Sequence, residues 1–502
     1  DIRGAQTADL NGDILAKDSI SVFGNKITLV GDAIADGMIA FGGGVVSEDQ
    51  SLSQALSFEV YDGDITSANE DVIIYAANVM ANQGVITSKA GDILIGGNTL
   101  SGSTAYEASK GDVFFQLENS LTLNAGANVT AGGNAVLIAD KTLVNSVVNA
   151  VNDIVLASAI DENQKPVSGT SVMIGSGGSL TTTEGNTIIA ADLFGSSGSV
   201  SAVKGAIGIW VDSLTDTGNI SSKKHLVIEL AGTSTLNING SVSGGEGTAL
   251  FANKIAVASG GTVKGGGGAV YLGGGVNDEN ELLRANSVTN SGVINGENGD
   301  VRIAAETIKS SGTLTSGTAD LFLTGGTITT AALSGGKIGL IADKDINLQG
   351  NVTALDRFLA KSDEADVHVG SFYYKVDVTA AAVSLSAGDK VFVHQSVVDA
   401  RGSAEFGIKG DLFIHSNDDI IVESKHWHDT RVEERQNYKK TIWDNKNIIS
   451  ELKASNDIGL FSKEGDFDFK SSKMTAGNGI VGSFGGGISG AARQHGEAYE
   501  LY

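Results

Sequence analysis

The central part of this chain repeats a short pattern, a small or polar turn followed by an apolar-polar-apolar strand, at a nearly constant interval. The middle apolar residue recurs at steps of 19 to 22 residues, with one step of 31, at Leu180, Val200, Ile220, Val242, Val263, Ile294, Leu314, Leu333 and Val352. A second series of strand positions keeps nearly the same period through Ile188, Ile207, Val227, Leu250, Val270, Arg302, Phe322 and Gly339. Two series with one period of about 20 residues are typical of a stacked solenoid, in which each repeat contacts mainly its neighbours.

This periodicity predicts an all-β fold, a right-handed parallel β-helix of about 20-residue turns, with roughly 25 turns in one long domain. The 68 glycines and the single proline suit many short strands joined by tight turns. Because the chain has no cysteine, hydrogen-bonded ladders and internal apolar stacks must hold it together. The net charge of −25 argues against a surface that binds nucleic acid.

The spacing and composition of the predicted strands divide the chain into five segments. They are irregular amino-terminal turns (1–62), regular β-helix (63–422), a charged and aromatic hairpin (423–446), further turns (447–478) and a Gly-rich tail without a clear period (479–502). The 31-residue step places an inserted loop at 273–286, in which ENELLRA could form one helical turn. Insertions of this kind often lie on the binding face of a solenoid, but we favour the simpler explanation that the solenoid tolerates a surface loop here. For the tail we expect a continuation or a contact segment, with disorder as the alternative.

Glycine followed by aspartate opens many of the predicted strands, at Asp64, Asp92, Asp112, Asp300, Asp389, Asp411 and Asp466. Stacked carboxylates could bind calcium or act as acids on one face of the solenoid. We favour turn chemistry, because glycine suits a corner and an aspartate side chain can accept hydrogen bonds from the backbone N–H groups that follow it. No catalytic or cofactor-binding residue is predicted.

The predicted hairpin differs from the rest of the chain in composition. It holds 11 charged residues among the 24 residues of 423–446, against 19% charged overall. The candidate interaction residues are Trp427, Arg431, Arg435, Tyr438 and Trp443, whose types commonly anchor protein interfaces. The alternative, which we favour slightly, is that these side chains simply cover the flank of the solenoid.

Two short motifs suggest metal binding, but neither carries a complete ligand set. His426 and His428 are two residues apart, so on a strand they face the same side, yet they supply only two ligands. The DLNGD sequence at Asp9–Asp13 starts like a calcium loop, but Ile14 and Ile20 occupy the positions that require glycine and glutamate. No metal site is therefore predicted.

Two features of the sequence resemble a known family. The first is the GDI/NVT solenoid from about residue 64 to 415, and the second is SNDDIIVESKHWHDTRVEERQNYKK followed by ASNDIGLFSKEGDFDFKSSKMTAG. Together they resemble the filamentous haemagglutinin-like exoproteins of bacterial two-partner secretion, which include contact-dependent inhibition proteins. That family's secretion domain carries Asn-Pro motifs, which a chain containing only Pro166 cannot supply, so the resemblance implies an internal segment.

The resemblance implies a non-catalytic stalk or fibre segment of a secreted adhesin at the bacterial cell surface. Its implied partners are an outer-membrane secretion barrel, a receptor or glycan on a host or neighbouring cell, and other copies of the chain, in lateral or end-to-end contact. One alternative is a β-helix enzyme that degrades polysaccharides, which would need carboxylates with Arg or Lys on adjacent turns of one face. Another is a trimeric fibre of the tailspike type, which a mass measurement in solution would distinguish.

Overall fold

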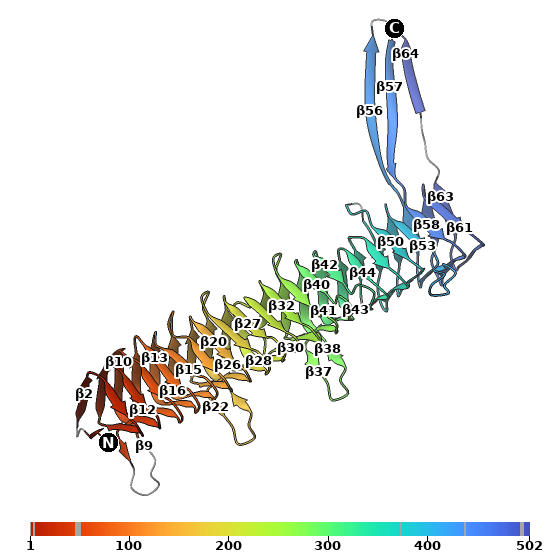
Figure 1. The fold of residues 1–502 in the computed structure, drawn as a ribbon. Helices are drawn as coiled ribbons and strands as arrows, with labels where there is room; N and C mark the ends of the chain where they lie inside the picture. Colours follow the sequence, from red (N-terminus) through yellow and green to blue (C-terminus); the bar gives the residue numbers. More distant parts are fainter. Residues whose placement is uncertain are drawn as a thin grey trace. The chain divides into compact units, whose positions relative to one another are not determined.

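The computed structural model describes residues 2–3, 6–45, 52–371, 373–435, 438–491 and 496–501, with only the backbone described for Val45, 425–435, 438–448, Ala491 and 496–501. Every regular element in these residues is a β-strand, and none of them forms a helix that could span a membrane. Packing divides the chain into unit 1, Asp1–Gly266, and unit 2, Gly267–Tyr502. The described strands of the two units stack in about 22 turns with a 21-residue spacing, which confirms the predicted parallel β-helix (Figure 1).

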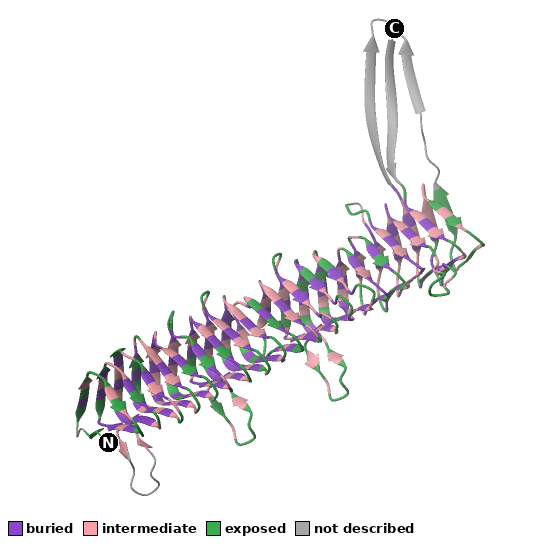
Figure 2. Ribbon diagram, in the orientation of Figure 1, coloured by how far each residue is buried: buried purple, intermediate pink, exposed green. Residues whose placement is uncertain are grey.

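In unit 1 the smaller sheet carries the first repeat series in the predicted register. Its strands β25 (Ser179–Thr182), β27 (Ser199–Ala202), β29 (Asn219–Ser222), β32 (Ser241–Gly244) and β35 (Thr262–Lys264) pair in parallel. The central residues Leu180, Val200, Ile220, Val242 and Val263 lie directly opposite one another and are fully buried. Each strand therefore contributes one residue to a continuous aliphatic column, and buried residues alternate with less buried ones in Figure 2.

The larger sheet of unit 1 corrects the second series. Ile207 of β28 (Ile207–Leu214) pairs with Thr187 of β26 (Thr187–Ser196), one residue away from the expected Ile188. Ile207 is buried, whereas Ile188 and Val227 are only half-buried. The predicted series thus mixed inward and outward positions, because a slip of one residue moves a side chain to the other face of a sheet.

Unit 2 repeats the arrangement. Strands β40 (Val293–Asn295), β42 (Thr313–Thr315), β44 (Leu333–Gly335) and β47 (Val352–Ala354) pair in parallel and bury Ile294, Leu314, Leu333 and Val352 in a second column. The tail, whose period was not visible in the sequence, continues the solenoid with β62 (Ile480–Phe484) and β63 (Ile488–Ala491). These strands pair in parallel with β59 (Ile458–Ser462) and β60 (Phe467–Lys470).

Three two-stranded hairpins leave the solenoid at the same position of a turn. They are β8 (Gly44–Val45) with β9 (Leu52–Ser53), β22 (Ala159–Ile160) with β23 (Pro166–Val167), and β37 (Gly275–Val276) with β38 (Leu282–Leu283). Each interrupts a strand of the larger sheet that the next turn forms without a break, as β12 (Val72–Ala81) does after β7 (Ile39–Gly42) and β10 (Ala55–Asp62). The two in unit 1 project from the same side of that unit (Figure 1).

The hairpin β37–β38 corrects the expected helical turn at 279–285. Asn277 closes the hairpin, because its Oδ1 accepts hydrogen bonds from the backbone N–H groups of Glu279 (3.0 Å) and Glu281 (2.8 Å). Asn280 adopts a φ of 61°, a left-handed conformation that ends any helical path there. The five residues that remain in 281–285 are too few to establish a helix after such a turn.

The predicted charged hairpin is also present. Strand β56 (Lys425–Arg435) pairs antiparallel with β57 (Tyr438–Ile448), and β64 (Gly496–Leu501) adds a third antiparallel strand to β57. The solenoid continues beneath it, since β53 (Val397–Ala400) pairs in parallel with β58 (Glu451–Ala454) on the far side of the insertion. The charged hairpin therefore projects from the solenoid, and the parallel pairing of the solenoid strands continues on both sides of the insertion.

Candidate functional site

The repeated carboxylates at the corners of unit 1 bind the backbone of the next turn. Asp71 Oδ1 accepts a hydrogen bond from the N–H of Asp92 (2.8 Å), and Asp92 Oδ1 accepts one from the N–H of Asp112 (2.8 Å). Asp112 Oδ1 continues the series with the N–H of Asn134 (2.7 Å), and Asn134 Oδ1 with that of Asp153 (3.1 Å). Asp92 and Asp112 thus accept backbone hydrogen bonds, but the expected partners were wrong, because the N–H groups belong to the next turn and not to the residues that follow.

The other predicted Gly-Asp positions behave similarly, with one exception. In each case Oδ1 of the aspartate accepts a hydrogen bond from a backbone N–H group of the next turn. The pairs are Asp64 with Val85 (2.8 Å), Asp300 with Asp320 (3.2 Å), Asp411 with Asp457 (3.3 Å) and Asp466 with Gly487 (2.5 Å). Asp389 is different, because burial and the neighbouring carboxylates of Asp366 and Asp418 raise its pKa. The carboxylates of this set mostly serve the fold.

The five candidate interaction residues lie on two strands that the structure pairs. Trp427, Arg431 and Arg435 belong to β56, and Tyr438 and Trp443 belong to β57. Arg435 and Tyr438 are opposite one another at the end of the hairpin. Their side chains lie outside the described part of the structure, so the interface hypothesis and its alternative both stay predictions.

The two metal motifs give no described site. The side chains of His426 and His428 also lie outside the described part. Asp13, the last residue of the DLNGD motif, accepts a hydrogen bond from the N–H of Asp32 (3.1 Å) and so belongs to a corner ladder. Among the described residues, no three His, Asp or Glu side chains lie close enough together to hold a metal ion.

An apolar stripe lies on the outer face of the larger sheet in unit 1. Inward residues of β12 such as Val72 and Ile74 are fully buried, and the outward residue between them is again apolar, Ile73. Ile73 lies opposite Leu94 of β14 (Ile93–Gly102), which lies opposite Phe114 of β16 (Val113–Leu123). All three outward side chains are half-buried. Three successive turns thus place hydrophobic groups where a solenoid exposed to water normally has polar ones.

A second outward row runs beside this stripe and carries an aromatic ring. Tyr75 lies opposite Gly96, which lies opposite Gln116. A Cβ atom on Gly96 would come within 2.9 Å of Tyr75 Cδ2 and 3.2 Å of Tyr75 Cε2, so one edge of the tyrosine ring lies against the glycine. Only a residue without a side chain permits this close approach. The ring therefore rests on the sheet, while Tyr75 remains only half-buried.

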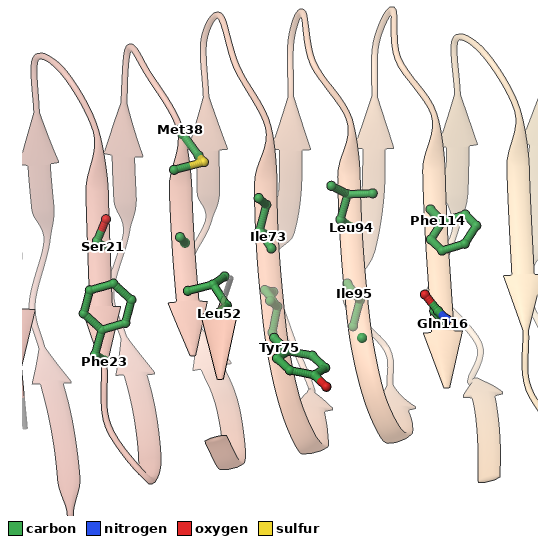
Figure 3. Close-up of a pocket in the computed structure, with 13 residues that line it drawn as sticks. Ser21, Phe23, Met38, Leu52, Ile73, Tyr75, Leu94, Ile95, Phe114 and Gln116 are labelled. Atoms are coloured by element: carbon green, nitrogen blue, oxygen red, sulfur yellow. The ribbon is translucent and has the colours of Figure 1, made fainter. Parts of the chain in front are cut away.

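Two hollows of about 580 and 550 Å³ form over these rows and share Tyr75, Gly96, Phe114 and Gln116. The first hollow is lined by Phe23, by Met38 and, from strand β9 of the hairpin β8–β9, by Leu52. Gln54, Ser158 and strand β22 of the hairpin β22–β23 line the second. We call the joined hollows the aromatic groove. Figure 3 shows the side chains of the first hollow projecting from adjacent strands, with the Phe23 and Tyr75 rings in one row and Ile73, Leu94 and Phe114 in the other.

The aromatic groove is nearly uncharged. None of the described side chains that line the first hollow is charged, and Glu118 is the one charged side chain among those lining the second. Gln54, Gln116 and the hydroxyl of Tyr75 supply polar groups at the same surface. In a chain with a net charge of −25, such a surface favours a neutral ligand with both apolar and hydrogen-bonding parts.

In unit 2 a smaller hollow of about 480 Å³ lies beside the hairpin β37–β38 and has a different character. Arg284, just after β38, forms two hydrogen bonds with Asp343 (2.5 and 3.0 Å) and lies 3.6 Å from Glu306. The Asp343 hydrogen bond raises the pKa of Arg284, and the same contact lowers that of Asp343. Arg302 lies in the same hollow, with its guanidinium 5.8 Å from the ring centre of Phe322. The predicted loop 273–286 is thus anchored by an ion pair.

Sequence reasoning located the insertions of 273–286 and 423–446 but missed the aromatic groove. A signal was present, since strands such as VIIY, DILI and DVFF have apolar residues at consecutive positions where a half-exposed strand would alternate. That pattern was assigned to the core alone. It could have indicated an apolar outer face as well.

Comparison with known proteins adds no assignment. No family model, no curated protein and no solved structure matches this chain.

Proposed function

We propose that this chain is a non-catalytic stalk or fibre segment of a secreted bacterial surface adhesin or contact-dependent system. The observation that supports the proposal most directly is the arrangement of the insertions. Hairpins leave the turns at one recurring position, while the parallel ladder continues on either side of each, as β12 does after β7 and β10. A scaffold of this kind presents separate contact elements without changing its core.

The proposed partners are a receptor or glycan on a host or neighbouring cell, and other copies of the chain in lateral or end-to-end contact. An outer-membrane secretion barrel, implied by the family resemblance, would export the chain to the cell surface. Absence of catalysis is part of the proposal. It is supported by the use of Asp64, Asp92 and Asp112 as hydrogen-bond acceptors for the next turn, which occupies these carboxylates structurally.

Adhesion of beads coated with the purified chain tests the proposal. We expect saturable attachment of the beads to bacterial or epithelial cells, and we expect soluble chain to inhibit it. Beads coated with heat-denatured chain should not attach. Attachment no greater than that of beads coated with an unrelated acidic protein would refute the adhesive role. Cleavage of pectin-like or sulfated glycans, abolished by a single Asp substitution, would refute the non-catalytic role.

A further inference from the structure

We propose that the aromatic groove of unit 1 binds a neutral, extended oligosaccharide. The inference deepens the proposed adhesive function and rests on it, because it names the ligand class of one contact surface. It starts from the arrangement of Tyr75, Phe114 and the row Ile73–Leu94, which together form a hydrophobic floor open to solvent.

The flat placement of Tyr75 is the first step. The Cδ2–Cε2 edge of its ring lies against Gly96, and Figure 3 shows the face of the ring from the outer side of the sheet, where the groove is. The face of an aromatic ring is electron-rich and attracts polarised C–H groups. One side of a pyranose ring presents such C–H groups, and its edge presents hydroxyls. A sugar can therefore stack on Tyr75 while its hydroxyls reach polar neighbours.

Polar side chains of the groove supply those neighbours. Gln116 lies next to Gly96 in the same outward row, and Gln54 lies on the wall, where its Nε2 is 3.4 Å from Asn98 Oδ1. A purely aliphatic ligand would cover these groups without giving them hydrogen bonds, at a cost in binding free energy. Hydroxyl groups satisfy them. The nearly uncharged lining disfavours an acidic sugar, which would also meet the strongly negative net charge of the chain.

The backbone beneath the groove disfavours a peptide strand. The central strand β14 already pairs with β12 on one side and β16 on the other, and β16 pairs with β18 (Ala135–Ile138). No sheet edge is therefore free within the groove floor for strand addition. Recognition there must use side chains, as sugar binding does.

The dimensions favour a linear chain of several units. The hairpins β8–β9 and β22–β23 follow β7 and β21 (Ile154–Ala157), and β12, β14, β16 and β18 lie between those two strands. With neighbouring strands about 4.8 Å apart, the hairpins are roughly 24 Å apart. A pyranose in an extended glycan is about as long as one inter-strand step, so the groove accommodates about four to five sugars.

Binding of defined oligosaccharides to the full chain tests the inference. Calorimetry with cellohexaose, laminarihexaose and maltohexaose should show one-site binding of at least one of them, and hexagalacturonate should bind more weakly. Tyr75→Ala should weaken that binding about tenfold or more. Gln116→Ala should weaken it less. The matched control is Phe322→Ala, which removes a similarly placed ring over Gly339 in unit 2 and should leave binding unchanged.

Circular dichroism melting of each variant distinguishes lost contacts from lost folding, and Tyr75→Phe gives a second, conservative variant that keeps the ring. Absence of binding by all three neutral hexaoses, or binding that Tyr75→Ala leaves unchanged in a folded chain, would overturn the inference. Laurate or an unstructured peptide that bound in their place would also overturn it. In each of these cases, cell adhesion of coated beads would still decide the proposed function separately.

Discussion

A residue's place in the two-residue alternation of a strand decides what it contributes to this fold. Val242 is fully buried between Ile220 and Val263, whereas the next residue, Ser243, faces outward and is partly exposed. The environment of adjacent residues thus changes from an aliphatic column to solvent. The same rule explains the aromatic groove, where the outward position of several turns is hydrophobic.

Val242→Asp should lower the free energy of unfolding by several kcal/mol, because it places an unpaired carboxylate between stacked aliphatic side chains. Ser243→Asp should change it by a few tenths of a kcal/mol at most. Denaturant unfolding of both variants is the measurement. Equal losses of stability would contradict the inward and outward assignment.

Asp112→Ala should cost about 1 kcal/mol, because the N–H of Asn134 loses the side-chain acceptor that now binds it at 2.7 Å. Asp112→Asn retains an amide oxygen at this position and should restore most of the loss, as Asn134 itself shows by accepting from Asp153 N–H. Urea unfolding of the two variants compares them. Equal losses with Asn and with Ala would mean that the negative charge, and not the hydrogen bond, matters here.

At the scale of elements, the sequence predicted repeats well and insertions only partly. The column from Leu180 to Val263 could be predicted because nearly the same spacing, 20 to 22 residues, recurs from turn to turn. The hairpins β8–β9 and β22–β23 were not predicted as hairpins. Their strands are only two residues long, and the two hairpins share no sequence pattern with each other. The aromatic groove forms where outward side chains of adjacent strands lie opposite one another. Predicting it requires the exact strand register, because an error of one residue moves every side chain to the other face of the sheet.

The Arg284 ion pair should hold the hairpin β37–β38 against the solenoid. Arg284→Ala should accelerate cleavage by a Glu-specific protease at the exposed Glu279 and Glu281, whereas Arg284→Lys should do so less. Because Arg284 lowers the pKa of Asp343, this contribution is present above the ordinary aspartate pKa of about 3.9 and is lost as the pH falls through the lowered value. Cleavage rates that are equal in the wild type and both variants would show that other contacts fix the hairpin.

Replacing 425–443 by a short Gly-Asn turn should separate adhesion from stability. The paired strands β53 and β58 continue the ladder on either side of the insertion, so the melting temperature should hardly change. If Trp427, Arg431, Arg435, Tyr438 and Trp443 form a contact surface, attachment of coated beads to cells should fall. Unchanged attachment would remove these residues from the adhesive hypothesis, and a large loss of melting temperature would favour their role as a cover of the solenoid.

At the scale of the whole chain, stability should be distributed over neighbouring turns. A turn pairs with the turn before and the turn after it, as β27 does with β25 and β29. In a solenoid of this kind the total is approximately a sum of the stabilities of single turns and of the interfaces between neighbours. No single cluster controls the fold, since unit 1 and unit 2 each have their own buried columns.

Val200→Asp tests whether this distribution is real. The buried carboxylate should disturb its own turn and the two that pair with it, which contain Leu180 and Ile220. Hydrogen exchange measured by mass spectrometry should then accelerate in peptides that cover 179–222. Peptides that cover 313–354 in unit 2 should retain the protection of the wild type, because their ladder does not include the altered turn. Ser201→Asp, at the neighbouring outward position, is the control and should change neither region. Equal acceleration in both regions would mean that the chain unfolds as one cooperative unit, and the additive description of its turns would then be wrong.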